Sequence, residues 1–152
     1  MKVLIAVKGS EDEDYFRRVA ALAPLQGARI ILAHVVDTAP RSDQTMGRER
    51  FMMRRPLSEE RSHELSEAES QRANAALQRA RAILDEVAVP AEDIREVVLR
   101  GKINEELRRL SEQENVDLIV VQGRPGKPGP HSLGKTARFL VDHAPHGALL
   151  VR

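Results

Sequence analysis

The residues Gly123-Arg-Pro-Gly126-Lys-Pro-Gly-Pro-His-Ser-Leu-Gly134-Lys135-Thr136 stand between an apolar run at 117–121 and an amphipathic run at 137–144. This order of strand, glycine-rich loop and helix is typical of phosphate-binding sites. Glycines let backbone N–H groups converge without a Cβ in the way, and the start of the following helix contributes roughly half a positive charge. The sequence therefore predicts an anion-binding loop.

Apolar runs and helical stripes alternate along the rest of the chain. Strands are predicted at 3–7, 30–36, 94–99, 118–121 and 148–151, because each is a short, continuous apolar run. Helical spacing predicts four helices between them, the first starting with a capping box at Ser10 and the last burying Val141. This alternation predicts one α/β domain over residues 1–152. We expect a doubly wound, five-stranded parallel sheet with helices on both faces, and a ligand site at the carboxyl ends of the strands where their order reverses.

The composition excludes several classes of function. The chain has 152 residues and no cysteine, so a disulfide framework, thiolate zinc sites and thiol catalysis are excluded. The net charge is only +1, so the protein as a whole has no strong electrostatic field to attract nucleic acid. Aromatic residues make up 3%, with no Trp, so there are few side chains on which bases could stack. No apolar run approaches the roughly 18 residues of a membrane helix. We therefore expect a cytoplasmic protein that binds neither nucleic acid nor membrane.

A long polar stretch separates the second strand from the next helix. Residues 38–57 show no clear period and are predicted to form a flexible surface loop. Residues 41–55 within it combine five arginines with Phe51, Met52 and Met53, which suits a lid or a partner-docking patch. A plain solvated loop is the favoured interpretation, since many long loops have no further role.

Several segments resemble the universal stress protein family: Lys8-Gly9-Ser10, His34-Val-Val-Asp37, Val116-Asp-Leu-Ile-Val-Val-Gln-Gly123 with Gly134, and Phe139-Leu-Val-Asp-His-Ala-Pro145 with Gly147-Ala-Leu-Leu-Val-Arg152. The resemblance covers nearly the whole chain except residues 38–64. It implies an adenine nucleotide alpha hydrolase-like fold and a stress-response regulator. Such a protein would bind ATP or a related adenine nucleotide, alone or with Mg²⁺, without hydrolysing it efficiently. The resemblance also implies a homodimer formed through the last strand, Ala148 to Val151.

The resemblance assigns nucleotide-binding positions at three strand ends and in the glycine-rich loop. They are Ala6, Val7, Lys8, Val35, Gln122, Gly123, Gly126, Gly134, Lys135 and Thr136. Seven residues separate Gly126 from Gly134, two fewer than in the family pattern, and Lys135 takes the place of a small hydroxyl residue, with Thr136 one position later. Lys8 stands where nucleotide-binding members carry an acidic residue. These departures leave a second hypothesis open, namely a family member that has lost the nucleotide and acts through a protein partner.

A rival interpretation concerns residues 129–136, which match the phosphate-loop pattern of P-loop NTPases. The context argues against it, because the loop does not leave its strand directly and only 16 residues follow Thr136. That length leaves no room for the later strand that organises Mg²⁺. No Ser, His and acidic set suits a hydrolase, and His143 and His146 lack a third metal ligand. The sequence thus predicts neither catalytic nor metal-binding residues.

Four cations are expected near the carboxyl end of the sheet. They are Lys8, Arg124, Lys127 and Lys135, and all follow predicted strands directly or lie in the glycine-rich loop. Their convergence suits an anionic ligand, although charges on loops also serve simply to keep a surface hydrated.

Overall fold

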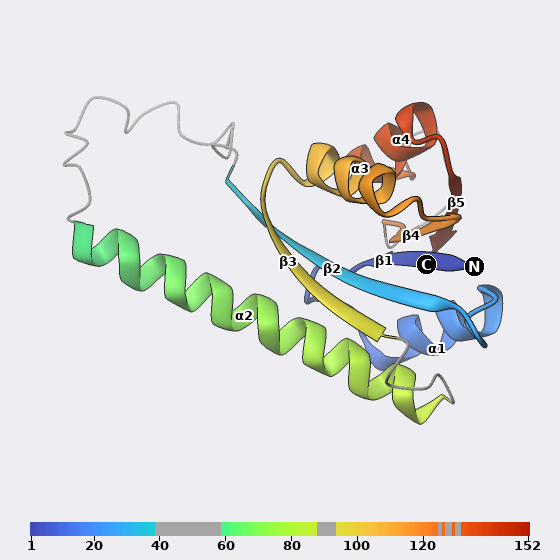
Figure 1. Ribbon diagram of the computed structural model, residues 1–152, viewed down its shortest axis with the longest axis horizontal. Coiled ribbons are helices and arrows are strands. Elements are labelled where there is room, and N and C mark those ends of the chain that lie inside the picture. Colours follow the sequence, from blue (N-terminus) through green and yellow to red (C-terminus); the bar gives the residue numbers. More distant parts are fainter. Residues whose placement is uncertain (39–58, 88–93, 125, 127–128, 130–131) are drawn as a thin grey trace.

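The computed structural model describes residues 1–38, 59–87, 94–124, 126, 129 and 132–152 (Figure 1). Along them the elements alternate as β1 (Lys2–Ala6), α1 (Glu13–Leu22), β2 (Arg29–Asp37), α2 (Glu59–Glu86), β3 (Ile94–Gly101), α3 (Ile103–Glu114), β4 (Leu118–Gln122), α4 (Gly134–His143) and β5 (Gly147–Val151). The predicted strands are confirmed to within two residues at each end. The loop predicted at 38–57, with its arginine- and methionine-rich part at 41–55, lies outside the described residues except for Thr38.

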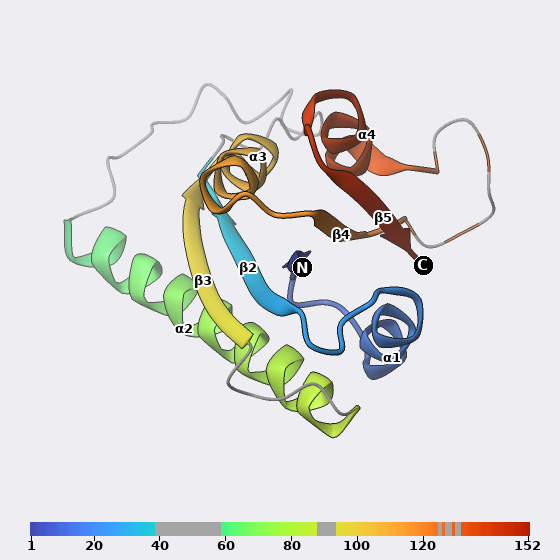
Figure 2. The ribbon, with the colours of Figure 1, turned by 45° about the vertical axis from the view of Figure 1, so that its right-hand side comes forward.

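The five strands form one sheet in the order β3-β2-β1-β4-β5, and every neighbouring pair is parallel. Ile5 of β1 lies opposite Leu32 of β2 and Val120 of β4. α1 and α2 cover one face of the sheet, and α3 and α4 cover the other (Figure 2). The strand order therefore reverses between β1 and β4. These observations confirm the predicted doubly wound α/β fold.

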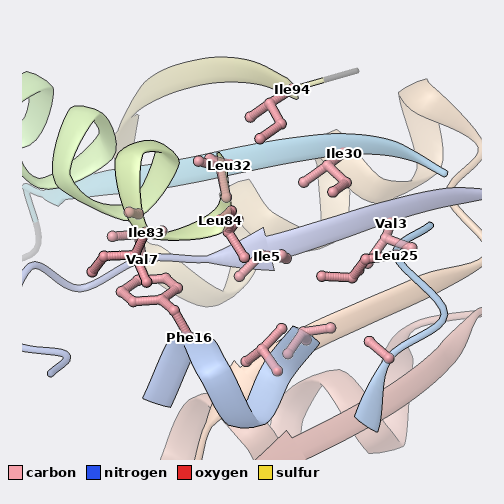
Figure 3. Close-up of a cluster of buried hydrophobic side chains, with 14 of the residues drawn as sticks. Val3, Ile5, Val7, Phe16, Leu25, Ile30, Leu32, Ile83, Leu84 and Ile94 are labelled. Atoms are coloured by element: carbon pink, nitrogen blue, oxygen red, sulfur yellow. The ribbon is translucent and has the colours of Figure 1, made fainter. Parts of the chain in front are cut away.

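The central strand β1 shows why its sequence is a continuous apolar run. Side chains alternate across a strand, and here both faces are covered by helices. Ile5 packs with α1 and α2, whereas Leu4 packs on the side of α3 and α4. Figure 3 shows Phe16 of α1 and Leu84 of α2 directed toward the strands, in the layer of side chains between the sheet and these two helices. Both side chains are almost fully buried, so this layer holds the two helices to the sheet.

The start of α1 differs from the prediction. Asp12 caps the helix, and its Oδ1 accepts a hydrogen bond from the Tyr15 N–H at 2.8 Å. The predicted capping box at Ser10 is therefore wrong by two residues. Glu11 is the reason, because its side chain is only 3% exposed and its carboxylate accepts two backbone N–H groups at the end of β1. The chain becomes helical only after that turn is complete.

The apolar stripe of α4 is narrower than predicted. The helix buries Ala137 and Leu140, but Val141 is 60% exposed. α4 packs on β5 at the edge of the sheet, with α3 beside it. A helix at a sheet edge has less surface covered than one above the centre, so the prediction of Val141 as a core residue is wrong.

The longest helix, α2, has 28 residues. It buries a stripe of small and aliphatic side chains against the sheet, namely Ala73, Leu77, Ala80, Ile83 and Leu84. None of the helices that the structure describes, α2 included, is long and apolar enough to cross a membrane.

Tyr15 brings a polar group into the core. Its side chain is 2% exposed, and its hydroxyl has no hydrogen-bond partner among the described residues. Burial, together with the nearby Glu11 carboxylate, raises the pKa of the phenol above its usual value. The unfolded chain therefore releases this proton at lower pH than the folded protein does. Stability from this group is fully present below the unfolded pKa of about 10 and is lost as the pH rises beyond it.

We expect the free energy of unfolding to fall by about 1.4 kcal/mol more between pH 8 and 11 in the unsubstituted chain than in Tyr15→Phe. Urea unfolding of both proteins across this range measures the difference. Tyr15 is the only tyrosine and there is no Trp, so near-ultraviolet absorbance reports its ionisation directly. The same pH dependence in both proteins would contradict the assignment.

Candidate functional site

A cleft of ≈ 670 Å³ opens at the carboxyl ends of β1, β2 and β4, next to the point where the strand order reverses. α2 closes one side of it and α3 the other. Ligands of doubly wound sheets bind at this position. Six of the predicted nucleotide-binding residues line the cleft: Ala6, Val7, Lys8, Val35, Gln122 and Thr136.

A tight turn shapes the cleft at the end of β1. Gly9 has a φ of +92°, and a Cβ there would lie 3.3 Å from the Cβ of Ala76 on α2, so only glycine fits without strain. The carboxylate of Glu11 accepts hydrogen bonds from the N–H groups of Lys8 at 2.5 Å and Gly9 at 2.7 Å. The turn places Lys8 at the cleft, where its Nζ lies 3.4 Å from the carbonyl oxygen of Gln122. Lys8 thus brings a positive charge to this end of the cleft.

α2 contributes two cations that the sequence analysis missed. Arg72 and Arg79 line the cleft, with Ala75 and Ala76 between them. Within the described part of the chain, neither arginine has a hydrogen-bond or ion-pair partner. Their spacing places both on one face of the helix, and the two alanines leave room beside them. This spacing was visible in the sequence, but only the tertiary structure shows that this face borders the cleft.

Arg100 of β3 holds this part of α2 in place. Its Nη2 donates to Ser70 Oγ at 2.6 Å and to the carbonyl oxygen of Ser66 at 3.1 Å. Its Nη1 lies 3.8 Å from Oε2 of Glu69, which also lines the cleft. The charge of Glu69 is therefore partly neutralised by Arg100, and the cationic side chains of α2 determine the charge on this side.

The wall formed by β2 is mainly apolar. It includes Ala33 and Val35, and Leu107 of α3 packs in the same cluster beside them. His34 also lines the cleft, and its Nδ1 is buried without a hydrogen-bond partner among the residues described. A buried ring nitrogen of this kind normally has a partner, and a ligand hydroxyl or amine would supply one.

Among the described residues of the glycine-rich loop, Thr136 lines the cleft. Gly123, Gly126, Gly134 and Lys135 are described, and none of them is among the residues that line it. Gly126 and Gly134 have φ angles of +120° and +75°, which favour glycine, so they shape the loop. A Cβ on Gly123 would lie 2.9 Å from Cγ of Arg152, so this glycine makes room for the Arg152 side chain. Direct binding by these four residues stays a prediction.

The predicted group of cations is brought together only in part. Lys8 lines the cleft, whereas Arg124 and Lys135 do not, and Lys127 is outside the described residues. The side chain of Arg124 instead lies by the start of α4, with its Cγ 3.5 Å from the position of a Cβ on Gly134. The described residues contain no group of three or more His, Asp or Glu side chains placed to hold a metal ion.

Solved structures share this fold and are 16–22% identical to the chain. Universal stress protein UspA from Lactobacillus plantarum aligns with a TM-score of 0.72 and 22% identity, over 100% of this chain and 97% of that one. The universal stress protein from Archaeoglobus fulgidus in complex with dAMP aligns with a TM-score of 0.65 and 17% identity, over 100% and 98%. A universal stress protein family protein from Arabidopsis thaliana with AMP bound aligns with a TM-score of 0.63 and 16% identity, over 99% and 90%.

Sequence comparison extends beyond the fold. None of the curated proteins compared matches the chain. The sequence model of the universal stress protein family, however, matches residues 1–152, which include every strand of the sheet and every residue of the cleft. This chain therefore belongs to the universal stress protein family.

Proposed function

We propose that this protein is a regulator that binds ATP or a related adenine nucleotide in the cleft and does not hydrolyse it efficiently. One observation carries the proposal: the cleft at the reversal of strand order brings six predicted binding residues, among them the cation Lys8, together with Arg72 and Arg79. Its volume of ≈ 670 Å³ lies within the range of about 300–1,000 Å³ for small-molecule sites. The relatives that hold AMP and dAMP support the choice of an adenine nucleotide.

The lining divides into an apolar and a cationic part. Val35 and Leu107 suit the faces of a purine base, and the unpaired Nδ1 of His34 suits a polar group on the base or the ribose. Lys8 and the two α2 arginines suit the phosphates, because guanidinium groups bind phosphate oxygens with two parallel hydrogen bonds. Thr136 adds a hydroxyl in the first turn of α4, where the helix N-terminus favours an anion.

The absence of efficient hydrolysis is part of the same proposal. Two carboxylates line the cleft among the described residues, Asp37 and Glu69, and both already interact with other groups. A general base must be free to take a proton from the attacking water. We expect incubation with ATP and Mg²⁺ to give ADP far more slowly than the roughly 1 s⁻¹ at the low end of typical enzyme turnover, and turnover at or above that rate would contradict this.

The second hypothesis, a protein-interaction module without nucleotide, rests on the turn after β1. The N–H groups of Lys8 and Gly9 are occupied by Glu11 and are not available to a ligand. Lys8 also replaces the acidic residue of the family pattern. Under this hypothesis no nucleotide stabilises the protein, so the experiment below separates the two.

Thermal unfolding with AMP, ATP, cyclic AMP and phosphate, each with and without Mg²⁺, tests nucleotide binding. A ligand at a hundredfold its dissociation constant is expected to add about 2.7 kcal/mol, or roughly 5–11 °C in Tm for a chain of this size. Ala75→Glu places bulk and negative charge in the cleft and is expected to abolish the shift. Asn74→Glu is the matched control, because this exposed neighbour adds the same charge on the same helix outside the cleft lining. No shift with any nucleotide at millimolar concentration would favour the protein-interaction hypothesis.

We also propose a homodimer formed through β5. β5 lies at the edge of the sheet and pairs with β4 on one side. The backbone N–H and C=O groups on its other side have no neighbouring strand among the described residues. Residues 148–150 are exposed or half-buried, as expected for a strand that pairs with a second copy. Light scattering is expected to give twice the chain mass of 17.0 kDa, and the monomer mass at micromolar concentration would contradict the proposal.

A further inference from the structure

A second hollow, of ≈ 340 Å³, lies beside the nucleotide cleft, between the start of α1 and the ends of β4 and β5. We call it the α1 pocket. Its lining includes the cations Lys8, Arg18 and Arg152 and the hydroxyl-bearing residues Ser10 and Tyr15. Lys8 and Gln122 line both hollows, so they form the partition between them. Arg18, Tyr15 and Arg152 line the α1 pocket but not the nucleotide cleft.

The hydroxyl of Tyr15 is the first sign of a ligand. Tyr15 is 2% exposed and lines the α1 pocket, yet its hydroxyl is buried without any partner in the described chain. Leaving a buried hydroxyl unpaired costs about 1–3 kcal/mol, and native structures rarely keep one without a reason. A phenol is protonated at neutral pH, so this unpaired hydroxyl is a hydrogen-bond donor and suits an acceptor in the pocket.

The arrangement of the two arginines is the second sign. Nη1 of Arg18 donates to the main-chain oxygen of Arg152 at 2.5 Å, and Nη2 of Arg152 donates to Ser132 Oγ at 2.8 Å. These bonds fix both side chains at the pocket and leave further N–H donors on each guanidinium. Neither arginine pairs with an Asp or Glu side chain among residues 1–38, 59–87, 94–124, 126, 129 and 132–152. Gly123 takes part as well, because its missing Cβ admits the Arg152 side chain.

The nearby carboxylates do not cancel this charge. Asp12 lines the pocket, but its Oδ1 caps α1 by accepting the Tyr15 N–H. Glu11 accepts the N–H groups of Lys8 and Gly9 with both of its oxygens. Both acidic side chains are thus engaged by backbone donors, and the three cationic side chains that line the pocket are not paired with them.

We propose that the α1 pocket binds a phosphate-class oxyanion, held by the guanidinium groups of Arg18 and Arg152 and by the hydroxyl of Tyr15. This site is distinct from the nucleotide cleft. The anion has two sources of the same chemistry, namely free phosphate and the terminal phosphate of a nucleotide that reaches past Lys8. In either case the charge of Lys8 acts on ligands in both hollows, since Lys8 lines both of them.

Titration with inorganic phosphate, pyrophosphate, AMP and ATP, followed by near-ultraviolet circular dichroism, tests the proposal. The signal comes from Tyr15, the only tyrosine in a chain without Trp. We expect an oxyanion to change the tyrosine signal, and Arg18→Gln to weaken its binding about tenfold or more. Tyr15→Phe is expected to weaken oxyanion binding about fivefold. Because this variant has no tyrosine signal, its binding is measured by calorimetry.

Arg17→Gln is the matched control. It removes the same charge from the neighbouring position of α1, but Arg17 pairs with Glu13 and lies 3.9 Å from Glu86, and it does not line the pocket. We expect it to change binding by less than about twofold, because an exposed charge acts weakly at a distance. Equal weakening by Arg17→Gln and Arg18→Gln, or no tyrosine response to any of the four probes, would overturn the proposal.

Ala75→Glu identifies the source of the anion and separates the two sites. A tyrosine response to free phosphate that survives this substitution identifies a free oxyanion as the ligand. A response to ATP alone that Ala75→Glu abolishes identifies a nucleotide phosphate. If Ala75→Glu loses the ATP-induced thermal shift but keeps the tyrosine response to phosphate, the result supports two separate sites, the nucleotide cleft and the α1 pocket. An intact ATP shift with no tyrosine response would overturn the α1 pocket and leave the nucleotide cleft standing.

Discussion

Phe16→Ala is expected to lower the free energy of unfolding by about 3–5 kcal/mol. Phe16 is 2% exposed and lies in the layer where α1 and α2 meet the sheet, edge to face with Tyr15 at a ring centroid distance of 5.1 Å. Truncation removes the apolar area of the ring and leaves a cavity that rigid strands cannot fill. For a chain of this size the loss corresponds to about 6–20 °C in Tm, measurable by thermal and urea unfolding.

Leu22→Ala provides the control for Phe16→Ala. Leu22 is on the same helix but 62% exposed, so its truncation is expected to change stability by less than about 0.5 kcal/mol. A loss at Phe16 no larger than the loss at Leu22 would show that α1 does not pack on the sheet as described.

Glu11→Ala is the second large effect, with an expected loss of about 3 kcal/mol. The Glu11 carboxylate is almost fully buried and accepts the N–H groups of Lys8 and Gly9. Removing it leaves two donors without partners in the turn that ends β1. Because that turn places Lys8 at both hollows, nucleotide and oxyanion binding are expected to weaken together.

Urea unfolding and ligand titration of the same variant separate these two consequences. Glu13→Ala is the control, because Glu13 is exposed in the first turn of α1 and its pair with Arg17 is worth about 0–1 kcal/mol. A Glu11→Ala protein as stable as Glu13→Ala would mean that the carboxylate is not needed to hold the turn.

The strands and their parallel arrangement could be predicted because the signal is local. A run such as 3–7 is apolar at every position, which occurs when both faces of a strand are covered. Alternation with amphipathic segments then restricts the topology to a doubly wound sheet. Val141 shows the limit of this reasoning, since helical spacing does not show whether a helix lies over the centre or the edge of a sheet.

The position of the cleft followed from the same pattern. The carboxyl ends of parallel strands meet at one edge, so residues such as Val7, Val35 and Gln122 had to lie close together once the strands were placed. The glycine-rich loop was harder to interpret, because its motif does not distinguish a glycine that contacts a ligand from one that admits a side chain. At Gly123 the structure shows the second role.

The sequence by itself thus determined the class of fold, the family resemblance and the edge of the sheet at which the cleft opens, because these depend on periodicity and on residues adjacent in the chain. Only the tertiary structure decided that Arg72 and Arg79 border the cleft, that Glu11 turns inward, and that the α1 pocket exists. Those features depend on contacts between distant residues. Arg18 and Arg152, for example, are 134 positions apart in the chain and meet by a hydrogen bond of 2.5 Å. No local pattern encodes such a contact, because packing of the whole sheet and its helices brings the two residues together.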